Sequence, residues 1–293
     1  FVILPVIMAA YYGFFRWKGY GKPQVNGQFV GFENYKIILT DPNFQEALGH
    51  TLFVVVASLV IQGPLAILFA LLLNQKFKGR ALIRTLIFVP YVVSEVIVGT
   101  GWSLMLQPTG AVNAVLAKFG ISGADWIADP KIAIWTLMFI ISWKYIGFAV
   151  ILMIAGMQSI PEDLYEAAKV DGAGFWRQQW SITLPLLGPT IRMWAFMSII
   201  GSLQLFDLVY IIWGQYVSST AGTSTMATYM VREGRLANNY GYGSAVAVVI
   251  FVISLVIALT YQHIVMNRDL DGALTDGKRG KRSHGTIVTS EVA

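Results

Sequence analysis

Residues 51–73, TLFVVVASLVIQGPLAILFALLL, contain no charged side chain. A helix needs about 20 mostly apolar residues to cross a bilayer, so this stretch predicts a membrane span. The rest of the chain has a similar character, because 56% of its 293 residues are hydrophobic and only 13% are charged. Soluble domains average about 25% charged residues. A chain this poor in charge cannot cover a water-facing surface, and its solvent is predicted to be a lipid bilayer.

Five further stretches are apolar enough to suggest spans, so we expect an all-α integral membrane protein. The six predicted membrane helices are residues 1–15, 51–73, 85–106, 132–157, 190–213 and 244–266. The first stretch lacks the basic segment and small-residue cleavage site of a signal peptide. We therefore expect a first helix that is truncated at its N-terminus, with a cleaved signal peptide as the alternative. The predicted organisation is one transmembrane domain over residues 1–266, followed by a polar tail over residues 267–293.

Positive charge predicts the orientation of the helices. The loop NQKFKGRALIR (74–84) carries four basic residues and no acid, and short basic loops stay in the cytoplasm. Alternation then places residues 158–185 and both termini on the cytoplasmic side of the membrane. Residues 16–50 also carry four basic residues and face outward in this arrangement, which weakens the argument. Flanking basic residues account for the net charge of +5 better than nucleic-acid binding does.

Residues 158–185 form a polar segment between two apolar stretches, and they predict a helical hairpin. Pro161 suits the start of a helix, and the acids Glu162 and Asp163 stand where the helix dipole favours negative charge. Asp171-Gly172 supplies a stop and a turn, because glycine tolerates a left-handed conformation. From these properties alone, an ordinary cytoplasmic loop with helical turns is an equal alternative.

The spacing within this hairpin resembles the EAA motif of ABC importer permeases. Glu166-Ala167-Ala168 is followed by Gly172 after three residues, and later by Ile182 and Leu184-Pro185 at the expected offsets. The resemblance covers nearly the whole chain and is to the binding-protein-dependent sugar importers similar to the maltose permease subunit. It is carried further by residues 79–93 (GRALIRTLIFVPYVV), 124–133 (ADWIADPKIA), 205–214 (LFDLVYIIWG) and 240–251 (YGYGSAVAVVIF). The chain departs from the family at Trp213-Gly214 and lacks the large outer insertion of some relatives.

The resemblance implies the six-helix fold of type I ABC importer permeases in a bacterial or archaeal cell membrane. It implies that the hairpin docks into a groove on an ATP-binding subunit and transmits the motion of that subunit. The implied coupling residues are Glu166, Ala167, Ala168, Asp171, Gly172, Leu184 and Pro185. Two ATP-binding subunits, a second permease and an extracellular substrate-binding protein are the implied partners.

The chain itself carries no convincing cofactor or metal site. It has no cysteine, and His50, His263 and His284 are far apart in sequence. A phosphate loop reads G-x-x-x-x-G-K-[ST], and the nearest string, GALTDGKR at 272–279, ends in arginine where the hydroxyl belongs. We therefore expect ATP and magnesium to bind only to the partner subunits.

Polar residues at membrane depth are costly, and they are candidates for a functional role. Glu95, Lys144 and Gln62 lie near the middle of predicted spans, and Asp207 lies in the outer half of another. Measured from the flanking motifs, the resemblance implies a substrate pathway lined by Glu95, Lys144, Tyr145, Phe148, Ser202, Gln204, Leu205 and Asp207. Carboxylates, amides and ammonium groups suit sugar hydroxyls. The alternative is that Glu95 and Lys144 neutralise each other or pair with the partner permease.

The sequence thus favours the permease subunit of an ATP-driven importer for a sugar, with an oligosaccharide as the expected substrate. Another solute, such as glycerol phosphate or a polyamine, is the first alternative. A secondary transporter that uses Glu95 and Asp207 as proton relays is a second. A polytopic membrane enzyme is disfavoured, because no histidine–carboxylate cluster or serine nucleophile motif is evident in the sequence.

Overall fold

The computed structural model describes residues 3–266, except for the side chains of residues 215–217 and Met266. The predicted polar tail, the string at 272–279 and the first two residues lie outside this range. The first half of the described chain contains two short strands and nine helices: α1 Ile3–Tyr12, β1 Phe15–Arg16, α2 Pro23–Asn26, β2 Gln28–Phe29, α3 Glu33–Thr40, α4 Pro42–Ala57, α5 Gly63–Leu73, α6 Arg80–Val92, α7 Glu95–Met105, α8 Ala111–Lys118 and α9 Ala133–Gln158.

The second half is helical throughout the elements that the structure describes there: α10 Glu162–Val170, α11 Phe175–Gln178, α12 Leu184–Leu186, α13 Gly188–Leu203, α14 Asp207–Thr220, α15 Met226–Val231 and α16 Tyr240–Tyr261. Four π-helical segments connect or extend these helices: Ser58–Gln62, Gln179–Thr183, Arg232–Leu236 and Gln262–Met266. The fold is thus almost entirely helical, as the apolar composition predicts.

Three continuous helices are long and apolar enough to cross a membrane. They are Pro42–Leu73, Ala133–Gln158 and Tyr240–Val265. Two bent pairs pass the same test when their halves are combined: Arg80–Val92 with Glu95–Met105, and Phe175–Leu186 with Gly188–Leu203. The described chain therefore has three to five candidate spans, and α1 is a shorter apolar helix. The prediction of six spans stays a prediction.

The predicted third span, residues 85–106, is not one straight helix. It breaks after α6, and the axes of α6 and α7 differ by 94°. Val93 and Ser94 adopt extended conformations at the break, and the Ser94 hydroxyl accepts a hydrogen bond from the Ile97 amide at 3.4 Å. Pro90 lies one turn earlier inside α6, and proline weakens the helix before the break.

The predicted fifth span, residues 190–213, is also interrupted. Helix α13 ends at Leu203, and α14 begins at Asp207 after a short link. An acidic residue in the first turn favours this new start. Asp207 therefore begins a separate helix and does not lie within a continuous span.

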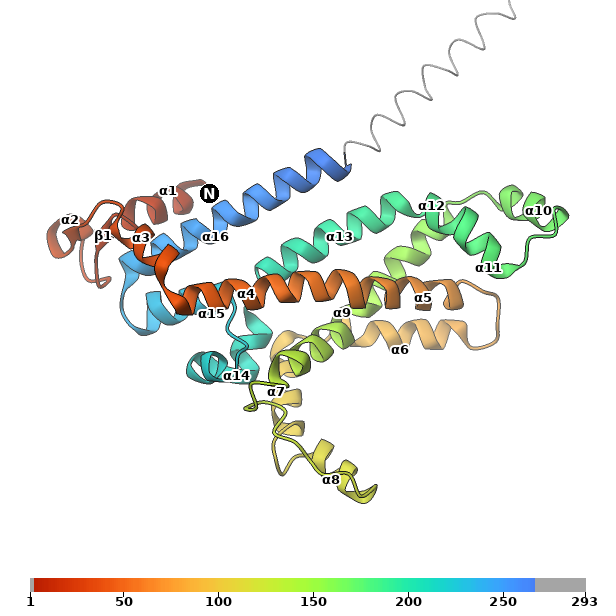
Figure 1. Ribbon diagram of the computed structural model, residues 1–293, viewed down its shortest axis with the longest axis horizontal. Coiled ribbons are helices and arrows are strands. Elements are labelled where there is room, and N and C mark those ends of the chain that lie inside the picture. The colour runs from red at the N-terminus through yellow and green to blue at the C-terminus, as the bar shows by residue number, and fades with distance from the viewer. Residues whose placement is uncertain (1–2, 267–293) are drawn as a thin grey trace, which may run out of the picture.

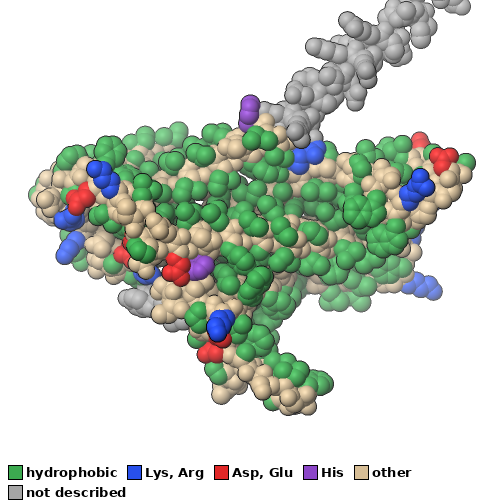
Figure 2. Space-filling model, viewed as in Figure 1, with side chains coloured by type: hydrophobic (Ala, Val, Ile, Leu, Met, Phe, Trp, Pro, Cys, Tyr) green, Lys and Arg blue, Asp and Glu red, His purple; other side chains and the backbone are tan. Residues whose placement is uncertain are grey.

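The long helices form an elongated bundle with two distinct ends (Figure 1). Helices α10 and α11 lie at one end, which we call the hairpin end, and α1, α2, α3 and β1 lie at the opposite end. Hydrophobic side chains cover the middle of the face in Figure 2, and most charged side chains lie toward its two ends, along its lower edge and on the lower projection. This distribution fits a bundle whose middle is surrounded by lipid.

Close helix packing in the bundle depends on a small residue at Gly147. A Cβ atom at this position of α9 would lie 2.2 Å from the Ile87 carbonyl oxygen of α6. Only glycine permits so close an approach of the two backbones. Helices α6 and α9 therefore pack in close backbone contact near their middles.

Candidate functional site

A cavity of about 220 Å³ lies within the bundle, between α4, α6, α9 and α13. Its wall combines apolar and aromatic side chains with hydroxyl and amide groups. The lining residues are Val54, Ser58, Gln62, Tyr91, Ile141, Tyr145, Phe148, Trp194, Met197, Ser198, Gly201, Ser202 and Leu205. None of these side chains carries a charge at neutral pH, so the cavity suits an uncharged ligand with both polar and apolar surfaces.

The polar edge of the cavity is built on a π-helical segment. The Ser58 hydroxyl donates to Gln62 Oε1 at 2.7 Å, and it lies 2.7 Å from the Ser198 hydroxyl of α13. Both Ser58 and Gln62 are buried. π-Helical turns inside α-helices are frequently found at functional sites, and here the turn carries both polar side chains of the α4–α5 helix that line the cavity.

Aromatic rings form another part of the wall. Tyr91 and Phe148 stack with ring centroids 5.0 Å apart and an interplanar angle of 20°. Tyr145 lies edge-on to Tyr91, with centroids 6.2 Å apart. Such rings can cover a flat apolar face of a ligand, while the serine and glutamine groups bind its polar substituents.

Four of the eight predicted pathway residues line this cavity: Tyr145, Phe148, Ser202 and Leu205. Glu95 lies next to it, at the start of α7, and accepts a hydrogen bond from the Tyr145 hydroxyl. Gln204 and Asp207 are exposed on this chain and are not among the lining residues. Their predicted role in a substrate pathway stays a prediction.

Lys144 has a different environment from the one expected for a cavity residue. Its side chain is only 2% exposed, and its Nζ donates to the Val93 carbonyl at 2.7 Å. Val93 is the residue at which α6 ends, and a cation stabilises the free carbonyls of a helix C-terminus. Lys144 and Glu95 thus each bind another group in the structure, a carbonyl and a phenol respectively.

Lys144 and Tyr145 together hold both sides of the break between α6 and α7. Lys144 binds the end of α6, and Tyr145 binds Glu95 in the first turn of α7. We call this adjacent pair on α9 the α9 clamp. It fixes the position of a bend that lies beside the cavity.

Several lining residues were not predicted from the sequence, namely Ser58, Tyr91, Trp194 and Ser198. Gln62 stood out as a polar residue in an apolar stretch, but it was not assigned to the pathway. A usable signal was present, because Ser58 and Gln62 are four residues apart and face the same side of a helix.

The polar hairpin consists of two legs, which are α10 and the segment from Phe175 to Leu186. Helix α10 ends at Val170, and after Asp171 the chain turns at Gly172 with a φ of +76°, as the sequence predicts. The Tyr165 hydroxyl lies 3.0 Å from the Thr183 hydroxyl, which donates to Gln179 Oε1 at 2.8 Å. The contact between Tyr165 and Thr183 joins the first leg to the second, and the bond to Gln179 holds Thr183 in place within the second.

The surface of the hairpin exposes both polar and large apolar side chains. Helix α10 contains no buried residue, and Glu166, Ala167, Gly172 and Pro185 are exposed, while Ala168 and Leu184 are partly buried. Large apolar side chains are exposed beside them: Val170 (88%), Trp180 (69%) and Trp176 (57%). Large apolar side chains that are exposed on a polar segment are available for contact with another molecule.

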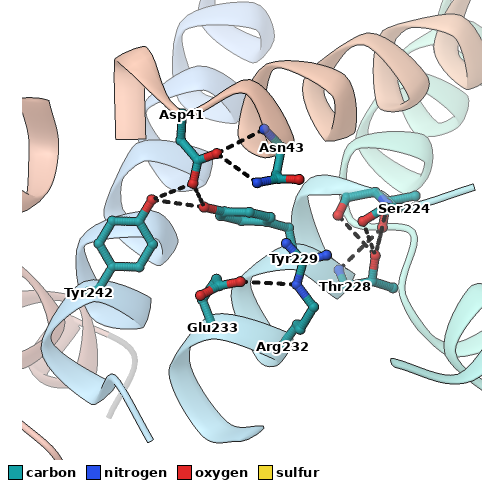
Figure 3. A network of polar contacts seen from close by, with 9 residues as sticks. Asp41, Asn43, Ser224, Thr228, Tyr229, Arg232, Glu233 and Tyr242 are labelled. Atoms are coloured by element: carbon teal, nitrogen blue, oxygen red, sulfur yellow. Dashed lines mark hydrogen bonds and ion pairs between the residues drawn. The ribbon is translucent and has the colours of Figure 1, made fainter. Parts of the chain in front are cut away.

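The opposite end of the bundle contains a polar network around Asp41 (Figure 3). The Asp41 carboxylate accepts hydrogen bonds from the Tyr229 hydroxyl at 2.5 Å, the Asn43 amide at 2.8 Å and the Tyr242 hydroxyl at 3.4 Å. The two tyrosine hydroxyls lie 2.8 Å apart. The network therefore joins the start of α4 to α15 and α16.

The network changes the acidity of its members. Burial acts to raise the pKa of the Asp41 carboxyl, but the hydrogen bonds from Tyr229 and Asn43 outweigh burial and lower the pKa below its usual 3.8. Burial and the hydrogen bond to Asp41 raise the pKa of the Tyr229 phenol. Asp41 is thus charged and Tyr229 neutral over the physiological pH range.

Within residues 3–266, no group of three His, Asp or Glu side chains is placed to hold a metal ion. The chemistry offered by the cavity is hydrogen bonding and apolar contact with a ligand.

Comparison with known proteins identifies relatives over most of the chain. Residues 62–268 match the family model described as "Binding-protein-dependent transport system inner membrane component". The trehalose/maltose transport system permease protein of Thermococcus litoralis is 32% identical over 80% of this chain and 79% of its own length. The sulfoquinovosyl glycerol transport system permease protein of Agrobacterium fabrum is 34% identical over 92% of this chain and 86% of its own.

A solved structure is also similar. It is that of a bacterial alginate ABC transporter in complex with an alginate pentasaccharide-bound periplasmic protein. One of its chains is 27% identical to this one and superimposes with a TM-score of 0.78, over 90% of this chain and 88% of that chain. The match covers the greater part of both chains, so the two share a common fold.

Proposed function

This chain belongs to the family of binding-protein-dependent transport system inner membrane components, and from that membership we propose that it carries an oligosaccharide or a glycoside across the membrane. It is the permease subunit of an ABC transporter, and the finer assignment concerns its substrate, its partners and the residues that contact them. The relatives named above transport, by their names, trehalose or maltose and sulfoquinovosyl glycerol.

The observation that carries the substrate assignment is the composition of the cavity wall. The uncharged polar edge of Ser58, Gln62 and Ser198 faces the same space as the Tyr91–Phe148 stack. Sugars present hydroxyl groups around their rims and apolar C–H faces, which match these two surfaces. A phosphate ester or a polyamine calls for a fixed charge of opposite sign, and none of the lining residues supplies one.

A second permease subunit completes the pathway in this proposal. The cavity measures about 220 Å³, whereas sites for small ligands usually measure about 300–1,000 Å³. An oligosaccharide needs more space than this chain provides alone. Gln204 and Asp207, which are exposed here, then line the part of the pathway that lies between the two subunits.

The hairpin provides the coupling to ATP. We assign the docking surface for an ATP-binding subunit to Glu166, Ala167, Ala168, Asp171, Gly172, Leu184 and Pro185. Two such subunits bind ATP and magnesium and close around the hairpins of the two permeases. The hairpin, the basic loop at 74–84 and both termini face the cytoplasm in this arrangement, and the chain crosses the membrane six times.

An extracellular binding protein delivers the substrate at the opposite end of the bundle. Closure of the ATP-binding subunits then moves the hairpins, and the membrane helices change from an inward-open to an outward-open state. ATP hydrolysis returns them. The chain performs no chemical step on the substrate.

The test is uptake into proteoliposomes by the complete transporter, purified through a tag on this chain and supplied with its binding protein. Labelled oligosaccharides, glycerol phosphate and a polyamine are compared, with ATP inside the vesicles or with a proton gradient alone. We expect ATP-dependent uptake of an oligosaccharide. Uptake driven by the proton gradient would support a secondary transporter, and ATP-dependent uptake of only a charged solute would overturn the sugar assignment.

The cavity is tested separately by Gln62→Leu, which has a similar volume but no amide. Loss of a hydrogen-bonding partner for the substrate costs about 1.5 kcal/mol, or roughly tenfold in apparent affinity. The matched control is Gln75→Leu, because Gln75 lies in the exposed loop beyond α5. Equal apparent affinities of the two variants would remove the cavity from the pathway.

A further inference from the structure

A second hollow lies on the bundle, separate from the cavity described above. It is a groove of about 340 Å³ between α6 and α9. Its polar residues are Arg84, Thr85 and Gln158, and its apolar residues include Phe88, Ile151 and Ala155. It shares no lining residue with the central cavity. Arg84 lies in the first turns of α6, and Gln158 is the last residue of α9 before the hairpin. The groove is therefore located at the hairpin end of the bundle.

Arg84 has an unused hydrogen-bond donor. Its Nη2 donates to the Leu73 carbonyl at the end of α5, at 2.7 Å. Its Nε is buried and has no hydrogen-bond partner within the described residues. A buried donor without an acceptor is destabilising, and the planar guanidinium group is suited to binding phosphate oxygens. Arg84 also lines the groove, so its delocalised positive charge is available there to an anionic ligand.

The loop before the groove adds positive charge. Lys76, Lys78 and Arg80 precede Arg84, and residues 74–84 contain no acid. Anionic lipid headgroups attract basic segments at the cytoplasmic surface of a membrane, and basic pockets between helices on that side bind lipid phosphate groups. The charge at this end of the groove is complementary to a phosphate ester.

The surroundings of the groove are apolar and exposed. Leu82 and Leu86 of α6 are 64% and 61% exposed, and Phe77 in the loop is 41% exposed. Such side chains face lipid in a membrane protein. The groove therefore combines a basic end with an apolar floor and opens beside an apolar surface. This arrangement matches the headgroup and acyl chain of a phospholipid.

Helices α6 and α9 need not separate to accommodate a ligand in the groove. They are already in close contact at Gly147, where a Cβ atom would also lie 2.9 Å from the Phe88 Cα. The α9 residues that line the groove, from Ile151 to Gln158, all follow this contact. The contact thus fixes the two walls at the end away from the basic loop.

We propose that this groove binds an anionic phospholipid, with its phosphate group at Arg84, Thr85 and Gln158 and an acyl chain along Phe88 and Ile151. The bound lipid joins the end of α9 to the start of α6 immediately before the hairpin. The proposal depends on the membrane location of the chain and not on the identity of the transported solute.

The test uses the complete transporter in nanodiscs that contain equal amounts of phosphatidylglycerol and phosphatidylcholine. The lipids retained after detergent extraction are counted by native mass spectrometry. We expect phosphatidylglycerol to be retained on the wild-type transporter. In the variant Gln158→Glu, the new carboxylate repels the phosphate, and retention should fall by at least about tenfold. Gln158→Leu is the size-matched control and should lose only a few-fold, because it removes one hydrogen bond.

Arg84→Gln should also abolish retention of phosphatidylglycerol. If Arg84→Gln fails to assemble, Gln158→Glu still tests the proposal, because Gln158→Glu leaves the hydrogen bond between Arg84 and Leu73 in place. Equal retention of the two lipids, or no loss in Gln158→Glu, would overturn the proposal. Displacement of phosphatidylglycerol by 10-fold excess inorganic phosphate would show that the site takes free phosphate, and crosslinks from position 158 to another subunit in the absence of bound lipid would assign the groove to protein contact. Either result would also overturn it.

Discussion

The two ends of the bundle treat their polar groups in opposite ways. At the outer end of the proposed orientation, Asp41, Tyr229 and Tyr242 satisfy one another through hydrogen bonds within the chain. At the hairpin end, helix α10 buries none of its residues, and the buried Nε of Arg84 has no hydrogen-bond partner among residues 3–266. The polar groups of the Asp41 network find their hydrogen-bond partners within the chain, whereas the hairpin end exposes surfaces that are available to other molecules.

This difference separates residues that stabilise the fold, at the outer end, from residues available to other subunits, at the hairpin end. A network whose members depend on each other is expensive to disturb, because each loss leaves a buried group unpaired. An exposed surface can be altered with little effect on the fold. Substitutions at the outer end should therefore reduce stability, and substitutions at the hairpin end should reduce activity alone.

The largest expected effect is that of Ala167→Arg on coupling. Ala167 is exposed on α10, so the new side chain fits the isolated subunit without strain. At a docked surface it buries an unpaired charge at a cost of about 3 kcal/mol, which is more than a hundredfold in affinity for the ATP-binding subunit. Co-purification and substrate-stimulated ATP hydrolysis measure this loss. The unfolding temperature of the subunit should stay unchanged, and a large drop would contradict the separation.

The second effect is that of Asp41→Ala at the outer end. The substitution removes the acceptor for Tyr229 and Tyr242 and the N-cap of α4. Together these losses should cost about 2–4 kcal/mol of stability. Thermal unfolding in detergent gives the shift in unfolding temperature. It is followed with a fluorescent dye that does not need a thiol to react with, because the chain contains no cysteine. Asp163→Ala is the control, since Asp163 is an exposed acid on α10, and an equal shift in both variants would abolish the contrast between the two ends.

The contribution of Asp41 should depend on pH. Its folded-state pKa is depressed, because the hydrogen bonds to the carboxylate outweigh burial. The stabilisation is therefore present above the unfolded-state pKa, near 3.8, and is lost as the pH falls through the lower folded-state value. The difference in unfolding temperature between the wild type and Asp41→Asn should be constant from pH 7 to about pH 5 and shrink below about pH 4. A difference that grows on acidification would contradict this assignment.

Glu95→Gln probes the region between the two ends. If Glu95 contributes to the substrate pathway, transport should fall by roughly tenfold, while assembly with the ATP-binding subunits stays intact. Tyr145→Phe removes the hydrogen bond from the Tyr145 hydroxyl and keeps the Glu95 carboxylate, whereas Glu95→Gln removes the charge and keeps an acceptor oxygen. Loss of transport in both variants indicates that the α9 clamp matters, whereas loss in Glu95→Gln alone indicates contact with the substrate. Normal uptake by Glu95→Gln would remove Glu95 from the pathway.

The smallest expected effect is that of Gly172→Ala in the hairpin turn. Space is available for a Cβ atom, but the φ of +76° is unfavourable for other residues, so the cost should be about 1 kcal/mol. Gly174→Ala is a matched control, because Gly174 also has free space around it and a φ of −68°. Hydrogen exchange of the α10 amides should increase in the first variant only. Equal exchange in both would show that the turn is not held in this conformation.

The hairpin was predictable from the sequence because its signals are local. Pro161, the acids that follow it and Asp171-Gly172 act on their immediate neighbours, and the structure places a helix and a turn where they predict. The long apolar helices were predictable for the same reason, since hydrophobicity alone decides where a chain can enter a bilayer.

The breaks in the spans and half of the pathway geometry depend on contacts between distant residues. The bend at Val93 and Ser94 lies in an apolar stretch, and it is held by Lys144 and Tyr145 from another helix. The sequence indicated that Lys144 was unusual but not that a backbone carbonyl was its partner. The sequence does not indicate Ser198, because uncharged hydroxyls are common in membrane helices and this one becomes informative only when packing brings it to Ser58.

The α9 clamp has a mechanical consequence. From Lys144 to Gln158, α9 is one uninterrupted helix, about 21 Å long at 1.5 Å per residue, and the hairpin follows after a short link. A continuous helix of this kind contains no break or kink at which a displacement of one end could be absorbed. We therefore expect a rotation imposed at its hairpin end to reach the two side chains that bind the α6–α7 bend, so the angle of that bend should change when the hairpin moves.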